Sequence, residues 1–329
     1  MLVVSGTKLA EEIGASGSEV WRLVQQLRSL GVQIAGHPGT GYTLESVPDL
    51  LLPEALDPLV AGTIFAGRLH HFFCAGSTNA AAMQAAQNGE AEGAVFVAEE
   101  QTAGRGRSGH TWYSAGGLGI YLSVILRPRM GPADALALSL MAGLAAAAAV
   151  EKVTGARPDL RWPNDLLLAR AFRTEAGVRL EERKFCGILT ELNAELTRVR
   201  YVVVGMGMNV NHESFPPELE SLATSLRLET GRTWSRVELA GALLQSLDRE
   251  YRRLHRAEED DDAQACTDLF RRFQEQSSYA RGRRVRVEER GGYTGTTAGL
   301  DARGFLLVRT DDDNGSIRTV LAGGVRACP

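Results

Sequence analysis

The sequence contains little cysteine and no residue spacing typical of a metal site. Its four cysteines lie far apart among 329 residues, and no C-x-x-C pair occurs; they are Cys74, Cys186, Cys266 and Cys328. The six histidines likewise form no H-E-x-x-H pattern. We therefore expect free thiols in a reducing cytosol and no structural metal.

Long hydrophobic runs are also scarce. The one such run, "ALALSLMAGLAAAAAV" at 135–150, is mostly alanine and lies between Asp134 and Glu151. A membrane-spanning helix needs about twenty strongly apolar residues, so this run predicts a buried helix instead. The N-terminal "MLVVSGTKLAEE" lacks the basic segment and apolar core of a signal peptide. We expect a cytoplasmic protein with no membrane segment.

The composition shows no excess of charge that would indicate disorder. Hydrophobic residues make up 44% and charged residues 23% of the chain, with a net charge of -4, which is typical of a folded globular protein. A chain of 329 residues exceeds one ordinary core, so we expect two or three domains.

Residues 1–48 predict a truncated winged helix-turn-helix. "TKLAEEIG" and "SGSEVWRLVQQLRSLG" have the spacing of helices and each ends in glycine. "VQIAGHPGTGYTL" then predicts a hairpin. The pattern leaves no room for the first helix of an ordinary winged helix.

Basic residues are few in this region. Up to Val47, three of them stand against four acidic ones: Lys8, Arg22 and Arg28 against Glu11, Glu12, Glu19 and Glu45. Phosphate neutralisation supplies most of the affinity of DNA-binding domains, and Glu19 lies at the start of the expected recognition helix. DNA binding through the helix-turn-helix at about Gly6 to Gln25 is therefore a secondary prediction.

Residues 60–277 predict a mixed α/β domain, which follows a Pro-containing linker, "SVPDLLLPEALDPL". Helical stretches at 78–88 and 134–154 alternate with apolar, β-rich pieces, namely "AVFVAEE", "GIYLSVIL", "DLRW", "DLLLA", "FCGILTEL" and "RVRYVVVGMGM". Two more helices are expected, one behind a capping box of Ser235 and Glu238 and one near 263–276. Residues 282–329 predict a small all-β module, an SH3-like barrel.

Glycine and arginine are concentrated in "GRGRSGHTWYSAGGLGIYLS", residues 104–123. Gly104, Gly106 and Gly109 match the dinucleotide fingerprint, but its third glycine must open a helix. Extended sequence follows here instead, and no G-K-[ST] of a Walker A motif is present. The stretch therefore predicts a flexible loop between two strands that presents Arg105 and Arg107 to phosphate or carboxylate oxygens.

Polar residues also adjoin three predicted strands. "RWPNDLLL" ends a strand in Trp-Pro-Asn-Asp at 162–165, and "ERKFCGILTEL" places Lys184 before a buried strand. "VVVGMGMNVN" ends in Gly205-x-Gly207, followed by Asn209. Since open α/β sheets bind ligands at strand ends, these stretches are candidates for one site.

In this order, with Ser77-Thr78-Asn79 upstream, the motifs resemble those of the biotin protein ligases. Bifunctional members combine a winged helix, a class II synthetase-like catalytic domain and an SH3-like domain, so the resemblance spans nearly the whole chain. It implies that biotin and ATP, with Mg²⁺, form biotinyl-5′-adenylate, and that a lysine of a biotin carboxyl carrier protein then takes the biotinyl group. It also implies repression of biotin genes through operator DNA, and a homodimer.

The resemblance assigns roles to individual residues. Biotin would contact Ser77, Thr78, Asn79, Gln101 and Gly106; Arg105, Arg107 and Lys184 would hold its carboxylate and the α-phosphate; the nucleotide would lie at Trp112, Asn164 and Asn209. Asp165 would orient or deprotonate the acceptor lysine or bind Mg²⁺, and these roles stay open. Ser77 could alternatively serve only as a helix cap, and Trp112 could belong only to the core.

Two features depart from the family pattern. Arg161 stands where lysine is common, which keeps the charge, and the eighteen residues 166–183 separate Asp165 from Lys184 where a short hairpin is usual. We expect this insert to be an exposed excursion, which puts the register of Lys184 in question. Two other functions remain open: a biotin-sensing transcription factor without ligase turnover, and a lipoate–protein ligase.

Overall fold

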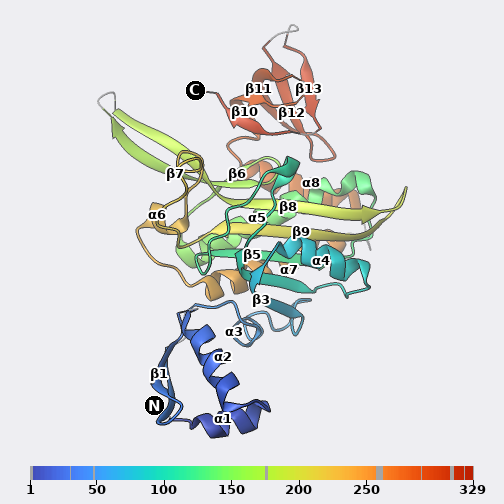
Figure 1. Cartoon of the computed structure of the whole chain (residues 1–329). Coiled ribbons are helices and arrows are strands. Elements are labelled where there is room, and N and C mark those ends of the chain that lie inside the picture. The colour runs from blue at the N-terminus through green and yellow to red at the C-terminus, as the bar shows by residue number, and fades with distance from the viewer. Residues whose placement is uncertain are drawn as a thin grey trace. The chain divides into compact units, whose positions relative to one another are not determined.

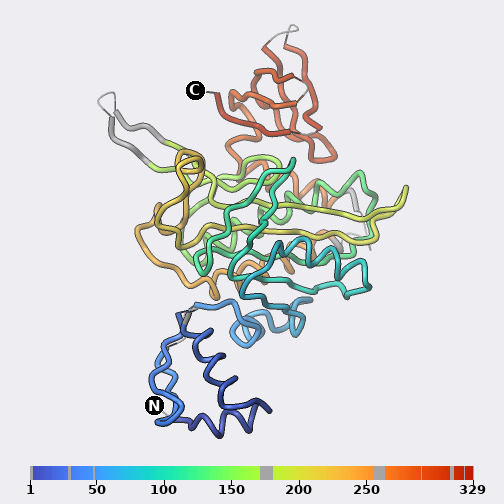
Figure 2. The backbone as a smooth tube through the Cα atoms, viewed as in Figure 1, coloured from blue at the N-terminus to red at the C-terminus, as the bar shows by residue number. Residues whose placement is uncertain are grey.

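A computed structural model describes residues 3–29, 31–46, 49–174, 177–256, 262–289, 291–311, 315–321 and 323–328. The chain divides into two compact units, Met1–Leu50 and Leu51–Pro329 (Figures 1 and 2). The second unit begins within the stretch predicted as a linker. Leu51, Leu56 and Val60 are buried there, around the short helix α3 (Pro53–Leu56), because they add to the apolar core of that unit.

The first unit has the predicted order of two helices and a hairpin. Its elements are α1 (Gly6–Ile13), α2 (Gly17–Ser29), β1 (Gln33–His37) and β2 (Gly41–Ser46). Gly14 ends α1 in the left-handed conformation, which glycine adopts without a steric penalty. Val20, Val24 and Tyr42 form the core. Arg28 donates hydrogen bonds to the carbonyl oxygens of Ile34 and Gly36 and thereby ties α2 to the hairpin.

The second unit is built on a seven-stranded sheet in the order β3-β4-β5-β9-β8-β7-β6. The strands are β3 (Leu69–Ala75), β4 (Val95–Gln101), β5 (Gly119–Leu126), β9 (Val199–Asn209), β8 (Gly177–Ala194), β7 (Asp165–Thr174) and β6 (Asp159–Arg161). Only β3 and β4 run parallel. All of these except β3 were predicted; β3 is an edge strand with no clear alternation of buried residues.

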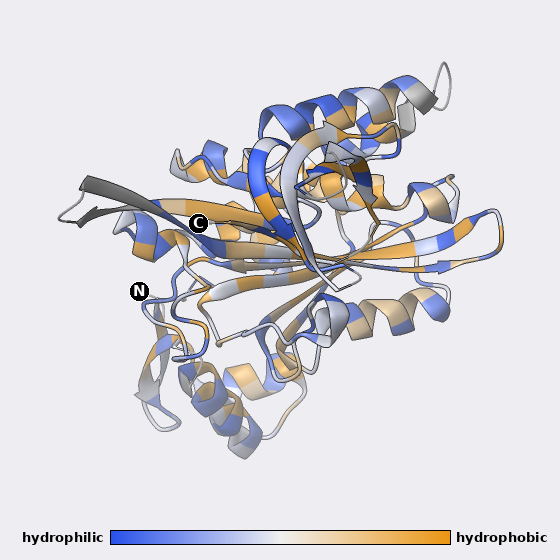
Figure 3. Cartoon of the chain, turned by 90° about the horizontal axis from the view of Figure 1, so that it is seen from above, coloured by the Kyte–Doolittle hydropathy of each residue, from blue (hydrophilic) through white to orange (hydrophobic). Residues whose placement is uncertain are grey.

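Helices cover both faces of the sheet, as the end-on view in Figure 3 shows. They are α4 (Thr78–Gln87), α5 (Leu136–Thr154), α6 (Leu226–Thr230), α7 (Arg236–Arg256) and α8 (Asp262–Glu275). Alternate residues of β9 explain the two cores: Val202 and Val204 pack in the cluster of α5, α7 and α8, whereas Val203 packs with α4.

The predicted buried helix is α5. It is long and apolar enough to cross a membrane by length and composition, but 78% of its most apolar window is buried inside the protein. The prediction of a core helix is thus confirmed.

The C-terminal residues form the predicted all-β module, an antiparallel sheet in the order β13-β12-β11-β10-β14. Its strands are β10 (Arg281–Val287), β11 (Tyr293–Leu300), β12 (Leu306–Thr310), β13 (Ile317–Val320) and β14 (Val325–Ala327). The module packs on the central domain through the turn at Gly304, whose carbonyl accepts a hydrogen bond of 2.9 Å from Trp162 Nε1. A side chain at Gly304 would approach the Phe270 ring to 2.7 Å, so glycine permits this close packing.

Candidate active site

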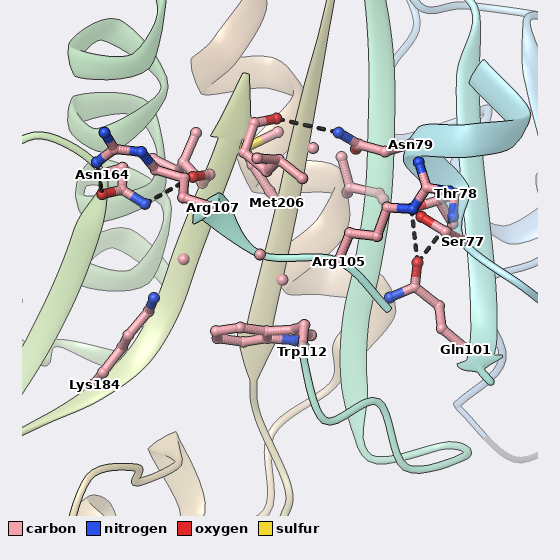
Figure 4. Close-up of a pocket in the computed structure, with 17 residues that line it drawn as sticks. Ser77, Thr78, Asn79, Gln101, Arg105, Arg107, Trp112, Asn164, Lys184 and Met206 are labelled. Carbon is pink, nitrogen blue, oxygen red and sulfur yellow. Dashed lines mark hydrogen bonds between the residues drawn. The ribbon is translucent and has the colours of Figure 1, made fainter. Parts of the chain in front are cut away.

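A pocket lies between the N-terminus of α4, the strands β5, β8 and β9, and the loop that joins β4 to β5 (Figure 4). The space between its walls is about 430 Å³, a volume that includes open solvent. Most of the predicted site residues line it, namely Ser77, Thr78, Asn79, Gln101, Arg105, Gly106, Arg107, Trp112, Asn164 and Lys184. The structure therefore brings together segments that are distant in the sequence.

One end of the pocket is lined by the neutral polar side chains of Ser77, Thr78, Asn79 and Gln101, and Figure 4 shows Arg105 on the same side. Gln101 Oε1 accepts hydrogen bonds from the Thr78 backbone N–H (2.8 Å) and from Thr78 Oγ1 (3.1 Å). Gln101 Nε2 donates to Ser114 Oγ at 2.9 Å, which fixes the orientation of the amide. Ser77 caps α4, since its Oγ accepts from the Ala80 N–H, and it also lines the pocket. The capping role and the pocket position therefore coexist.

Asn79 completes this end, and both halves of its amide are engaged. Its Nδ2 donates to Glu191 Oε2 at 2.8 Å, and Ser123 Oγ lies 2.6 Å from its Oδ1. A Cβ atom on Gly205 would overlap Asn79 Oδ1. The first glycine of Gly205-x-Gly207 is therefore required by the close approach of Asn79.

The Gly-Arg-Gly-Arg loop closes the pocket on the side of β4 and β5. Arg105 pairs with Thr111 across the loop, and Trp112 N–H donates to the Gly104 carbonyl at 2.9 Å. A Cβ atom on Gly104 would lie 2.5 Å from Trp112 O, so this loop conformation needs glycine there. The first glycine therefore serves the packing of the loop on itself.

Arg107 is held at the other end of the pocket. Its Nη1 donates to Asn164 Oδ1 at 2.9 Å, and Asn164 Nδ2 donates to the Ile188 carbonyl at 2.9 Å. Burial lowers the pKa of Arg107, and the nearby Asp165 offsets part of that effect. An arginine remains charged under such conditions, so this end of the pocket carries a partly desolvated cation.

Lys184 supplies a second cation beside Arg107 and Asn164, as Figure 4 shows. Its Nζ lies 2.6 Å from Asp165 Oδ1 and 5.1 Å from the centroid of the Trp112 ring. Two glycines make room for this group: a Cβ on Gly187 would lie 2.8 Å from Lys184 Cε, and one on Gly207 would overlap Trp112 Nε1. Trp112 thus packs against Lys184 at the pocket wall.

Asp165 sits behind Lys184 and does not line the pocket. It forms ion pairs with Lys184 and with Arg161, each at 2.6 Å. Burial alone would raise the pKa of Asp165, but Lys184 and Arg161 more than offset this and hold it below its usual value. Asp165 is therefore an ionised carboxylate shared by two cations.

The insert before Lys184 extends β7 and β8 into one long hairpin; residues 175 and 176 lie outside the described part of the chain. Leu167 pairs with Lys184 across a register shift, and Asp165 pairs with Gly187. The prediction of a wholly exposed excursion is wrong at its start, because Leu166, Leu167 and Leu168 are buried in the core. The predicted register of Lys184 agrees with its place in the pocket.

Asn209 lies outside the pocket lining. It is buried at the end of β9, where its Nδ2 donates to the Thr224 carbonyl at 3.0 Å. Its Oδ1 is buried and has no hydrogen-bond partner among the described residues. Its contact with a nucleotide stays a prediction.

Several residues that line the pocket had no predicted contact with a ligand: Leu122, Gly187, Ile188, Leu189, Gly205, Met206 and Gly207. The three glycines stood in quoted motifs, and a signal was available in their placement inside apolar strands, where glycine often marks a close approach by another group. The apolar residues gave no such signal, because buried strand residues look alike in sequence.

The described residues contain no group of three His, Cys, Asp or Glu side chains that could hold a metal ion. The pocket instead combines a hydrogen-bonding end with the cations Arg107 and Lys184. It suits a small molecule with a polar head and a carboxylate or phosphate at the other end.

Comparison with known proteins matches each part of the chain. Residues 74–209 match the model of the Biotin/lipoate A/B protein ligase family, residues 2–43 an HTH domain, and residues 281–325 the Biotin protein ligase C terminal domain. The chain is 32% identical over 314 residues to the bifunctional ligase/repressor BirA of Bacillus spizizenii, covering 94% of this chain and 90% of that protein.

Two further relatives extend this similarity. BirA of Escherichia coli is 31% identical over 244 residues, covering 74% of this chain and 70% of that protein. A biotin protein ligase from Aquifex aeolicus in complex with biotin and ATP is 28% identical, with a TM-score of 0.62, over 80% of this chain and 100% of that one.

Proposed function

Because this chain belongs to the biotin protein ligase family, we propose that it activates biotin with ATP to biotinyl-5′-adenylate and transfers the biotinyl group to a lysine of a biotin carboxyl carrier protein. The observation that carries this proposal is the pair of cations, Arg107 and Lys184, beside a hydrogen-bonding end in one pocket. A carboxylate and a phosphate repel each other, so a site that joins them must supply positive charge between them.

In the first step, a carboxylate oxygen of biotin attacks the α-phosphorus of ATP, and the bond to the bridging oxygen breaks as pyrophosphate leaves. Arg105, Arg107 and Lys184 would hold the two anionic groups, since all three line the pocket. In the second step, the amine of the carrier lysine attacks the acyl carbon, AMP leaves and the amine loses a proton. Trp112 would limit the access of water to the reactive anhydride.

Asp165 would act by holding Lys184. Its carboxylate already accepts from two cations, and a group kept ionised by such partners is a weak base at neutral pH. The same pairing leaves it poorly suited to Mg²⁺. The side chains around it fit phosphate oxygens better than a metal, and Mg²⁺ would remain on the triphosphate.

Lipoate is the competing substrate, since the matched family model includes ligases for both cofactors. Thr78, Asn79 and Gln101 form a polar end with both hydrogen-bond donors and acceptors. The ureido ring of biotin offers N–H donors to such a surface, whereas the dithiolane of lipoate offers none. The similarity of the whole chain to BirA points the same way.

We also propose that the N-terminal unit binds operator DNA and represses biotin genes; in support, it matches an HTH domain and the BirA relatives are named ligase/repressors. The charge available for this is small. Arg28 is bound to the hairpin carbonyls, Arg22 pairs with Glu19 and Lys8 with Glu12. We therefore expect the affinity for DNA to fall only weakly as the salt concentration rises. Titration of the protein with operator duplex at two salt concentrations, with biotin and ATP present, measures this dependence.

A cytoplasmic location and a homodimer complete the proposal. The four cysteines are free thiols, which suits a reducing compartment. β3 lies at one edge of the central sheet with no strand beyond it in the described part of the chain, and an open edge can pair with a second copy. Light scattering after gel filtration, with and without biotin and ATP, would give the oligomeric state.

The decisive experiment is to incubate the protein with biotin, ATP and Mg²⁺ and to measure the mass of the bound adduct. A ligase yields biotinyl-5′-adenylate, and addition of carrier protein then yields biotinylated carrier and AMP. A biotin sensor without turnover would retain unmodified biotin and release no pyrophosphate. That result would contradict the proposed function.

A further inference from the structure

A chain of polar contacts leads from the C-terminal module to Lys184. It begins at Tyr279, which lies just before β10 and is only 2% exposed. Tyr279 Oη donates to Glu182 Oε2 at 2.8 Å, and Arg283 Nη2 lies 2.8 Å from the same oxygen. The guanidinium of Arg283 also stacks 4.7 Å from the centroid of the Tyr279 ring. The start of the module is thus fixed to β8.

Arg161 continues the chain toward the pocket. Its guanidinium lies beside the Tyr279 hydroxyl and donates a hydrogen bond of 2.6 Å to Asp165 Oδ2. Asp165 Oδ1 in turn meets Lys184 Nζ at 2.6 Å. Apart from the neutral Tyr279, positive and negative side chains alternate along the path, which consists of Arg283, Glu182, Tyr279, Arg161, Asp165 and Lys184.

The backbone beside Arg161 is held by the same part of the C-terminal region. Ser277 Oγ donates to the Leu160 carbonyl at 2.5 Å, and Ser278 N–H donates to Asp159 Oδ1 at 2.8 Å. The short strand β6 is therefore fastened along its outer edge by residues that lead into the module. Arg161, at the end of β6, can move little without breaking these bonds.

The sharing of Asp165 has an electrostatic consequence. A carboxylate that faces Lys184 alone would neutralise most of its charge and draw the ammonium away from the pocket. Because Arg161 takes one oxygen of Asp165, Lys184 keeps more of its positive charge for an anion. Tyr279, fixed by its hydrogen bond to Glu182, interacts with Arg161 and so restricts where that guanidinium can lie.

We propose that Tyr279 and Arg161 are positioning residues through which the C-terminal module sets the anion preference of the pocket at Lys184. Neither residue lines the pocket; both act through Asp165. The proposal rests on the proposed function, because it takes the carboxylate of biotin as the anion in question. It gives the module a role in the chemistry beyond packing on the central domain.

The test compares two ligands that share one head group. Biotin carries a carboxylate, whereas biotinamide carries a neutral amide at the same place. Calorimetric titration gives the ratio of their affinities for the full-length protein. In Tyr279→Phe, we expect this ratio to fall about tenfold, the scale for a lost hydrogen bond to a charged group, while the affinity for biotinamide stays unchanged. A purely structural defect would weaken both ligands alike.

Tyr293→Phe is the matched control. Tyr293 belongs to the same module, and its buried Oη has no hydrogen-bond partner among the described residues, so the same substitution should leave the ratio unchanged. Arg161→Gln serves as a second variant if Tyr279→Phe does not fold. It keeps a donor toward Asp165 but removes the charge, and the ratio should fall by more than in Tyr279→Phe.

The outcomes separate the two claims. If the wild-type protein binds neither ligand, the proposed function fails. If the wild-type protein prefers biotin, and both folded variants have the same ratio of biotin to biotinamide affinity as the wild type, the positioning role is overturned although the ligase function stands. A fall in the ratio in either variant, with biotinamide binding intact, supports the positioning role.

Discussion

Replacing Lys184 with alanine should remove most of the adenylation activity while the protein stays folded. An ammonium 4 Å from a phosphate contributes about 4 kcal/mol at an effective dielectric constant of about 20, which corresponds to nearly three powers of ten in rate. Asp165 neutralises part of this charge at 2.6 Å. We therefore expect kcat to fall toward the lower end of the range of about 100- to 1000-fold seen when one charge-stabilising group is lost.

The fold should survive because Asp165 keeps its second ion pair, with Arg161, when Lys184 is lost. The assay is biotin-dependent exchange of labelled pyrophosphate into ATP, with circular dichroism and a thermal melt to confirm folding. Lys152→Ala is the control, since Lys152 lies exposed on α5, away from the pocket lining, and donates a hydrogen bond to Gln245. Near-normal exchange in folded Lys184→Ala would refute the assignment of Lys184 to the reaction.

The remaining predictions concern stability, pocket shape and DNA. Lys184 and Arg161 outweigh burial and hold the pKa of Asp165 below its usual value, so its contribution to stability is present above pH ~4 and is lost as the pH falls through the lowered pKa. In urea titrations, the difference in unfolding free energy between wild type and Asp165→Asn should shrink below that pH, and a constant difference would contradict this. Gly205→Ala should weaken biotin binding about tenfold, because the new Cβ atom would overlap Asn79 Oδ1. Gly143→Ala is the control, since its new atom would meet neighbours only at 3.6 Å or more, and it should leave the affinity unchanged. Equal calorimetric affinities of Gly205→Ala and wild type for biotin would count against the close approach of Asn79. Glu19→Gln should tighten operator binding a few-fold at low salt only, and identical anisotropy curves would place Glu19 away from DNA.

Predictions from the sequence were most successful at positions where the local structure calls for one kind of residue. Gly104 and the strand-like residues after it excluded a dinucleotide site, and the structure shows why glycine is needed there: a Cβ would meet Trp112 O. Lys184 could be placed beside the pocket because it directly precedes an apolar segment, which is the buried part of β8 that begins at Phe185. The helix caps at Ser77 and Ser235 could be predicted for the same reason, since each accepts a backbone N–H at the start of its helix.

Other features could not be predicted because they depend on contacts between distant residues. The link between Arg161 and Tyr279 joins positions that are 118 residues apart, and neither belongs to a motif on its own. Asp165 follows Asn164 directly, yet only Asn164 lines the pocket; adjacent residues of an extended chain face opposite ways. β3 was missed because its partly exposed face hides the alternation that marks a strand.

Arg107 gives the strongest structural argument for catalysis over mere sensing of biotin. Burial lowers its pKa, so the protein keeps a partly desolvated cation at a cost in free energy, and that cation donates to a neutral amide, Asn164. Retention of biotin alone would require one partner for one carboxylate, and Lys184 already supplies it. A second half-buried cation in the same pocket is useful when a second anion must approach the first, as the α-phosphate does in adenylation. The positions of Arg107 and Lys184 at one end of the pocket therefore favour a site built to join two anions.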